Sequence, residues 1–194
     1  YFKVEPIVWR VLTTTYEVPG EKEELQGSGK ALLLAEKILT GGIPYYVDKD
    51  ERTIIGAGTS EGKDPDIVCP NNYQYSTIRA WLNGKYEDDD TQDKTYSNKG
   101  FLQTAFTREA QGLIPPTTVY NGLLSLFGRG EEIEETNSFA CVNTKDEIFL
   151  LSVQEATNYE FARFDQYGEG NTRIRVTTDY AKATGAYQSA TAGY

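Results

Sequence analysis

The sequence contains no histidine and no methionine, and it has only two cysteines among its 194 residues. Without histidine the chain cannot form a Ser-His-Asp or Cys-His nucleophile system, a His-ligated zinc site or an imidazole switch near neutral pH. Two cysteines without histidine do not complete a metal site unaided. We therefore expect no metal and no cofactor.

Positive charge and long apolar runs are also scarce. Lys and Arg number 19 against 29 Asp and Glu, which gives a net charge of 19 − 29 = −10. This charge repels phosphate backbones and anionic lipid heads, so nucleic acid and membrane surfaces are unfavourable partners. No apolar run approaches the length of a membrane span. Because no initiator methionine is present, we expect Tyr1 to be a processed or trimmed start, with any signal peptide or lipid anchor before it.

The two cysteines, Cys69 and Cys141, lie 141 − 69 = 72 positions apart in the sequence. In an exported protein they could form a disulfide bond, and closing a loop of this length would stabilise the fold by about 4 kcal/mol in the chain-entropy model. Two unrelated buried thiols are the alternative, because free cysteine is among the most buried residue types. The sequence leaves both interpretations open.

A short helix around Trp81 is the most completely specified element of the chain. Ser76 is placed to cap its first turn, and Gly84 favours a left-handed exit. Ile78, Trp81 and Leu82 fall at i, i+3 and i+4, so they share one face, with the polar residues to its side. Because so short a helix forms only when it is packed, we expect Trp81 to be a core residue.

Two apolar segments near the N-terminus predict an antiparallel hairpin with a long loop. Residues 7–12 alternate in polarity, with Ile7, Trp9 and Val11 expected to face inward. Residues 31–34 form an apolar run that predicts the second strand.

The middle of the chain predicts further short elements. Residues 36–39 indicate one helical turn, and residues 101–106 indicate a helix. Thr107 is typical of a residue that caps a second helix, which Pro115 prevents from continuing. Residues 117–120 are β-prone.

A strand followed directly by a helix is predicted in the last third of the chain. Residues 148–151 form a continuous apolar run that suits a strand buried on both sides. Ser152 and Glu155 then have the spacing of a capping box at a helix start. A later helical turn is predicted to begin near Thr178 and to end at Gly185.

These elements predict an α+β fold with a twisted, mostly antiparallel sheet and two or more short helices, in one domain over residues 1–194 that is trimmed at both ends. Four segments are also informative by their order and spacing: Pro6–Leu12, Leu32–Leu39, Ser76–Asn83 with Ala105–Thr107, and Asp146–Ala156. Together they resemble a bacterial domain family of unknown function. That family occurs mostly in exported and cell-surface proteins and ends in a Trp-Trp-Leu-Arg-Ser signature.

Residues 180–187 are similar to that family's approach to its signature, but this chain stops at Tyr194 before the signature begins. The resemblance implies a C-type-lectin-like domain, and an extracellular or cell-envelope location that includes lipid anchorage through a segment outside this sequence. It supplies no agreed catalytic residues, so none is carried over.

We interpret the chain as a non-catalytic surface module of unknown function that binds a glycan, a protein or another ligand through its long loops. Tyrosine is abundant, at 14 residues, and offers contact area at low entropic cost, although buried tyrosine is common. The candidate contact residues are Tyr73, Tyr75, Tyr167, Arg173, Arg175 and Tyr187.

Three alternatives remain open. A hydrolase with paired carboxylates needs only two of the 29 acidic residues, although no spacing singles out a pair. An oxidase of the formylglycine-generating kind requires Cys69 and Cys141 together in an exposed pocket. A purely structural or antigenic envelope protein is not separable from a binding module by sequence, and the oligomeric state is not specified.

Overall fold

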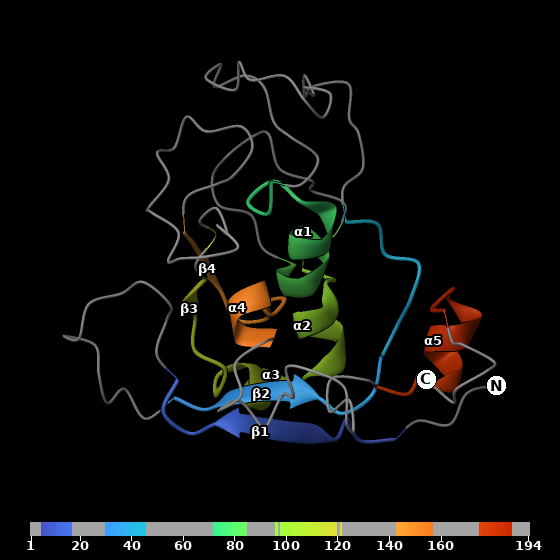
Figure 1. Cartoon of the computed structure of the whole chain (residues 1–194), viewed down its shortest axis with the longest axis horizontal. Helices are drawn as coiled ribbons and strands as arrows, with labels where there is room; N and C mark the ends of the chain where they lie inside the picture. The colour runs from blue at the N-terminus through green and yellow to red at the C-terminus, as the bar shows by residue number, and fades with distance from the viewer. Residues whose placement is uncertain are drawn as a thin grey trace, which may run out of the picture. The chain divides into compact units, whose positions relative to one another are not determined.

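The computed structural model of the chain describes residues 5–16, 30–45, 72–84, 96, 98–119, 121, 143–156 and 175–187. Contacts within the chain define two compact units. Unit 1 comprises Tyr1–Ile43 and Leu151–Tyr194, and unit 2 comprises Pro44–Leu150. The described elements are short helices and two-stranded antiparallel sheets, which confirms the predicted α+β class (Figure 1). The single domain over residues 1–194 stays a prediction.

Unit 1 contains the predicted hairpin, in which β1 (Trp9–Thr13) pairs antiparallel with β2 (Leu32–Ala35) (Figure 1). Arg10 lies opposite Leu34, and the register shifts between Val11 and Thr13, so the ladder is irregular there. Such a shift arises where one strand holds an extra residue.

The hairpin buries a different face from the one that the alternation predicts. Leu12 and Leu32 are 5% and 6% exposed, whereas Val11 and Leu33 are 52% and 46% exposed. The prediction that Val11 faces inward is therefore wrong. The register shift interrupts the alternation of side chains at Leu12, which accounts for the burial of Leu12 in place of Val11. The neighbouring Arg10 is half-buried, and its guanidinium has a carboxylate partner, Glu36.

The segment after β2 bends at residues 36 and 37 and forms a β-bridge at Ile38, so the predicted helical turn at residues 36–39 is wrong. Ile38 forms an isolated parallel bridge with Thr177. The Ile38 N–H donates to the Val176 carbonyl and the Thr178 N–H donates to the Ile38 carbonyl, each at 3.0 Å. Its backbone groups are therefore used by a distant segment of the same unit rather than by a local helix.

Two short helices complete the described part of unit 1, and both begin as predicted. In α4 (Val153–Ala156) the Ser152 N–H donates to Glu155 Oε2 at 2.8 Å and the Glu155 N–H donates to Ser152 Oγ at 3.1 Å, which confirms the capping box. The hydroxyl of the buried Tyr16 donates to Glu155 Oε1 at 2.5 Å. In α5 (Asp179–Ala183) the hydroxyl of Thr178 accepts the Ala181 N–H at 3.0 Å.

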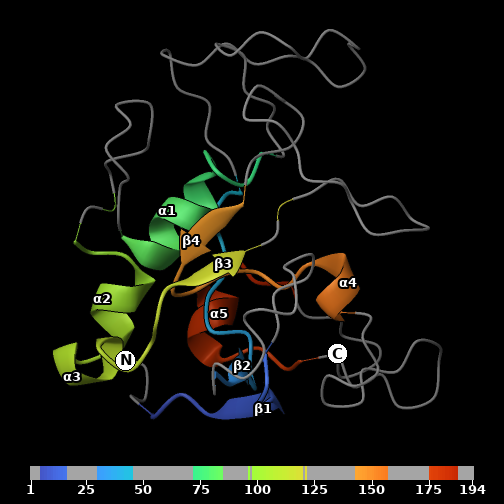
Figure 2. The same cartoon turned by 90° about the vertical axis from the view of Figure 1, so that its left-hand side faces the viewer.

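Unit 2 is built from three short helices and one hairpin in its described part. The elements are α1 (Thr77–Asn83), α2 (Phe101–Ala105), α3 (Arg108–Gln111), β3 (Thr117–Val119) and β4 (Thr144–Asp146). The strands β3 and β4 pair antiparallel, and Figure 2 shows them side by side, next to α1. The helix α3 begins at its predicted cap, since the Thr107 hydroxyl accepts the Ala110 N–H at 3.3 Å.

The helix α1 begins and ends where the sequence predicts. Ser76 Oγ accepts the Arg79 N–H at 3.2 Å, and Gly84 has φ 58°, in the left-handed region. The ring of Trp81 is half-buried and lies 5.4 Å from the ring of Phe101, between centroids. Trp81 therefore packs between helices of unit 2.

The predicted strand at residues 148–151 is wrong, because β4 ends at Asp146 and Leu150 is 45% exposed. The reason lies in Asn83, whose Oδ1 accepts the N–H groups of both Glu147 and Ile148 at 3.1 Å. In an extended strand two consecutive N–H groups point to opposite sides, so they could not both reach one acceptor.

Candidate functional site

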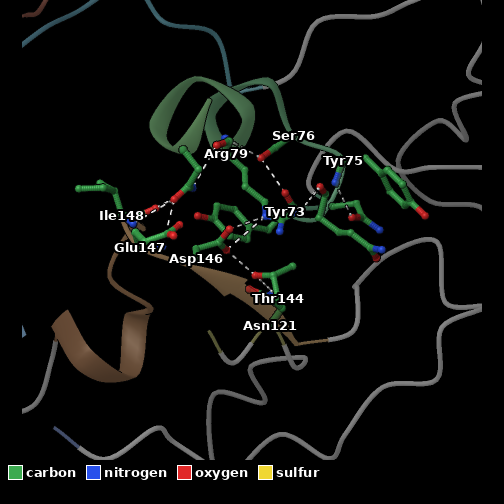
Figure 3. A network of polar contacts seen from close by, with 12 residues as sticks. Tyr73, Tyr75, Ser76, Arg79, Asn121, Thr144, Asp146, Glu147 and Ile148 are labelled. Carbon is green, nitrogen blue, oxygen red and sulfur yellow. Dashed lines mark hydrogen bonds and ion pairs between the residues drawn. The ribbon is translucent and has the colours of Figure 1, made fainter. Parts of the chain in front are cut away.

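A polar network in the described part of unit 2 centres on a buried ion pair. Arg79 extends from α1 toward Asp146 on β4, and its Nε donates to Oδ1 at 2.9 Å and to Oδ2 at 3.2 Å (Figure 3). The two side chains are only 7% and 2% exposed. Thr144 Oγ1 donates to Asp146 Oδ2 at 2.7 Å, and Arg79 Nη1 donates to the Gln74 carbonyl at 3.0 Å.

This network joins α1 to β4 rather than opening toward solvent. Asn83, which is 3% exposed, adds a second connection, because its Nδ2 donates to the Ile148 carbonyl at 2.9 Å while its Oδ1 accepts from the same segment. A buried carboxylate with a guanidinium and a hydroxyl partner has its charge compensated within the core. We therefore assign the network to the architecture of unit 2.

Tyr73 lies at the edge of this network and is 9% exposed. Its ring belongs to a small apolar cluster with Val119, against which Ile78 and Phe149 pack. Burial raises the pKa of the Tyr73 phenol well above its usual value, and the negative charge of Asp146 raises it further. Among the six candidate contact residues, Tyr73 is therefore a core residue of unit 2 in this structure.

A charge cluster in unit 1 contains the candidate Arg175. The guanidinium of Arg10 donates to both oxygens of Glu36, at 2.8 Å and 2.6 Å. This contact lowers the pKa of Glu36, and the charge of Arg175 lowers it further. Burial lowers the pKa of Arg175, the charge of Arg10 adds to that effect, and Glu36 opposes it. Two guanidiniums are thus arranged around one carboxylate.

The helix α5 is held at both ends by residues 38–42, an arrangement that we call the α5 clamp. At its start, the Thr178 hydroxyl donates to the Leu39 carbonyl at 3.3 Å. At its end, the Gly41 N–H donates to Thr184 Oγ1 at 2.8 Å. The same hydroxyl lies 3.0 Å from the Tyr180 carbonyl, to which it donates. The Thr184 hydroxyl thereby links the last turn of α5 to the backbone of Gly41.

Glycine is required at Gly41 because the chain segments of the clamp approach closely. A Cβ built on Gly41 would lie 2.1 Å from the backbone nitrogen of Ala186. The neighbouring Gly42 has φ +72°, and a Cβ there would lie 2.3 Å from the Thr184 carbonyl oxygen. Within α5, Ala181 is fully buried, at 0% exposed. The backbone at the end of α5 therefore lies directly against the backbone of Gly41 and Gly42, with no side chain between them.

Two tyrosine side chains of α5 and of the segment that follows it are exposed. Tyr187 is 86% exposed and Tyr180 is 50% exposed, and we call these two side chains the α5 surface. Tyr187 follows Ala186, whose N–H donates to the Ala181 carbonyl at 2.8 Å. The α5 surface therefore combines an exposed aromatic residue with a backbone that is fixed one residue before it.

The structure distributes the sequence-predicted residues between the two units. Tyr73 and the half-buried Tyr75 precede α1 in unit 2, whereas Arg175 and Tyr187 flank α5 in unit 1. The remaining predictions fall on residues outside the described part of the chain: Tyr167, Arg173, and the cysteines Cys69 and Cys141. Their roles, and the pairing of the cysteines, stay predictions.

Sequence reasoning missed Thr184 and Asp146, both of which hold distant segments together. No local pattern marks Thr184, because its partner Gly41 is 143 positions away. The adjacent glycines at positions 41 and 42 were the available signal, since paired glycines also occur where another backbone approaches closely.

Two further properties limit the chemistry of the described residues. No group of three or more His, Cys, Asp and Glu side chains among them is placed to hold a metal ion. None of the described helices has the length and apolar character that crossing a bilayer requires.

A family model for a domain of unknown function (DUF6273) matches residues 28–192. Neither the curated proteins nor the solved structures contain a match to the chain.

Proposed function

We propose that this chain, which belongs to the DUF6273 family of domains of unknown function, is a non-catalytic module that binds a glycan or a protein through the α5 surface. The observation that carries the proposal is the 86% exposure of Tyr187 beside a clamped backbone. Tyrosine supplies a large, amphipathic contact area at low entropic cost, and a fixed backbone lowers the cost of ordering the contact on binding.

The use of three of the described carboxylates supports a non-catalytic role. Asp146 is compensated by Arg79 in the core of unit 2, Glu36 by Arg10 on the hairpin, and Glu155 caps α4. A glycoside hydrolase of the usual kind needs two carboxyl groups that face each other across a substrate. These three carboxylates instead each hold structural elements together.

The biological setting is also a proposal. The acidic composition, the abundance of tyrosine and the likeness to a family of bacterial exported and cell-surface domains support a location outside the cell or in its envelope. The α+β class with short antiparallel sheets is compatible with the proposed C-type-lectin-like relationship. Fractionation of the source cells, followed by immunodetection, tests the location, and a purely cytosolic signal would contradict it.

A glycan array tests the function directly. The full chain is applied to an array of bacterial and animal glycans, together with Tyr187→Ala, Tyr180→Ala and the control Leu113→Ala. Leu113 is 84% exposed and lies in unit 2, so it matches Tyr187 in exposure but not in position. We expect Tyr187→Ala to lower the signal of bound glycans at least about tenfold, as the loss of a central aromatic contact does.

Three results would contradict glycan binding by the α5 surface. These are the absence of any bound glycan, equal signals for Tyr187→Ala and the unmodified chain, and an equal loss for Leu113→Ala. The protein-binding form of the proposal is examined by repeating the comparison with purified envelope proteins in place of glycans.

A further inference from the structure

We infer that Thr184 is a positioning residue for the α5 surface: its hydroxyl, which accepts the Gly41 N–H, fixes the course of the backbone that presents Tyr187. This inference rests on the proposed function, because it assigns a role to residues that support the same surface. Its physical basis is independent of any ligand and lies in the contacts at the end of α5.

The Thr184 hydroxyl has bonds in two directions. It accepts the Gly41 N–H at 2.8 Å and donates toward the Tyr180 and Ala181 carbonyls, at 3.0 Å and 3.1 Å. Thr40 Oγ1 lies 3.3 Å from it. A single hydroxyl therefore connects the C-terminal end of α5, where helical carbonyls lack intrahelical partners, to another segment of the unit.

The chain after Thr184 has little freedom. Gly185 has φ +100° and its N–H donates to the Lys182 carbonyl at 3.1 Å, while the Ala186 N–H donates to the Ala181 carbonyl at 2.8 Å. Gly41 lies so close that a Cβ on it would meet the Ala186 nitrogen at 2.1 Å. Residues 184–186 are thus fixed from the helix side by hydrogen bonds and from the other side by contact with glycine backbone.

A helix as short as α5 does not persist on its own intrahelical bonds, so these tertiary contacts decide where its end lies. Without the Thr184 hydroxyl, the last turn loses its link to Gly41 and the segment to Tyr187 can separate from the clamp. The expected consequence is local: the α5 end loosens while the β1–β2 hairpin keeps its own hydrogen bonds.

Amide hydrogen exchange, followed by NMR on the full chain, tests this inference without a ligand. Thr184→Val removes the hydroxyl at nearly constant shape, and Thr184→Ser restores it. We expect Thr184→Val to accelerate exchange of the Gly185 and Ala186 amides at least about tenfold and to leave the amides of the β1–β2 hairpin within about twofold, because local openings differ in free energy across a structure. We expect Thr184→Ser to exchange like the unmodified chain.

A second variant perturbs the same clamp at Gly41 instead of Thr184. Gly41→Ala introduces the close contact with Ala186 without removing a hydroxyl, and we expect the same local acceleration. Gly112→Ala is the matched control, because a Cβ on Gly112 would meet its nearest neighbour, the Glu109 carbonyl oxygen, at 3.4 Å. Unchanged exchange in both clamp variants, or acceleration spread equally over the hairpin of unit 1, would overturn the positioning role.

The glycan array then connects the clamp to function. On the glycans whose signal Tyr187→Ala lowers, we expect Thr184→Val to lose at least about fivefold and Thr184→Ser to retain the signal. If the array shows no bound glycan, the glycan-binding form of the proposed function fails while the exchange experiment still decides the clamp. If exchange accelerates locally but glycan signals are unchanged by Thr184→Val, the clamp does not position the binding surface and the inference is wrong.

Discussion

Replacing Arg79 with methionine would show how strongly the buried ion pair stabilises unit 2. Arg79 and Asp146 are 7% and 2% exposed, and their closest atoms are 2.9 Å apart. Arg79→Met keeps an apolar side chain of similar length but leaves the Asp146 carboxylate buried without its guanidinium. Breaking a buried pair in this way costs about 3–5 kcal/mol, so we expect the free energy of unfolding of unit 2 to fall by that amount.

Urea unfolding monitored by tryptophan fluorescence measures this loss. The chain has two tryptophans, and Trp9→Phe leaves Trp81 of unit 2 as the only indole. In that background, Arg79→Met, Asp146→Leu and the double variant form a thermodynamic cycle. Because the double variant buries no unpaired charge, we expect it to be more stable than either single variant, with a coupling energy above about 2 kcal/mol.

The reasoning fails if the two single effects simply add. An additive double variant would mean that neither group depends on the other, in spite of their contact. A loss below about 1 kcal/mol for Arg79→Met would place the pair among exposed ion pairs, which contribute little to stability. Either result would remove the ion pair from the set of interactions that hold β4 against α1.

Three other predictions use the same measurement of stability. Asn83→Asp should lower the free energy of unfolding by about 2–3 kcal/mol, because the carboxylate oxygen that replaces Nδ2 cannot donate to the Arg79 and Ile148 carbonyls, which Nδ2 contacts at 3.2 Å and 2.9 Å. Stability equal to that of the unmodified chain would contradict these contacts. Gly84→Ala should lower the free energy of unfolding by about 1–3 kcal/mol, since Gly84 has φ +58° and a Cβ there would lie 2.0 Å from Gln103 Oε1, whereas Gly112→Ala should be near neutral. Equal losses of stability for the two variants would contradict backbone strain at Gly84. Arg10 lowers the pKa of Glu36, so Glu36 is protonated at lower pH in the folded state than in the unfolded state. The ion pair therefore stabilises the fold above the ordinary glutamate pKa of 4.5, and this stabilisation is lost as the pH falls below that value. The difference in stability between the unmodified chain and Glu36→Gln should be under about 1 kcal/mol at neutral pH, because the pair is one-third exposed, and it should shrink as the pH falls below 4.5. A difference that grows on acidification would contradict this sign.

The ends of the helices were predictable from the sequence because local residues determine them. Ser76, Thr107 and Thr178 each cap the helix that follows, and each hydroxyl accepts an N–H three residues ahead. Ser152 and Glu155 form the capping box that their spacing indicates. In every case the donor and the acceptor lie within one turn, so a short window of sequence contains the whole interaction.

Buried faces were harder to predict because they depend on distant partners. The sequence places Arg79 at the side of α1, yet Arg79 is buried, because Asp146, 67 positions away, accepts its hydrogen bonds. The alternation predicts that Val11 faces inward, yet the hairpin buries Leu12 and leaves Val11 52% exposed. Hydrophobicity alone does not specify a face when a charged residue on it has a partner elsewhere in the chain.

The candidate site shows the same division between composition and position. The sequence predicts the same role for Tyr73 and Tyr187 because tyrosine offers contact area, but the first is 9% exposed and the second 86% exposed. Exposure depends on packing around each ring, which the sequence around either tyrosine does not specify. The clamp residue Thr184 was missed because its partner Gly41 lies 143 positions away.

Both units rely on side chains that bind the backbone of a distant segment, and this bears on how binding could evolve here. Asn83 holds residues 147 and 148 in unit 2, and Thr184 holds Gly41 in unit 1. Short helices and two-stranded sheets are marginal alone, so these bonds fix elements whose own propensities are insufficient. The side chain of Tyr187 takes part in neither of these bonds and is largely exposed. Its side chain can therefore change without unfolding unit 1, which makes ligand preference at the α5 surface separable from stability.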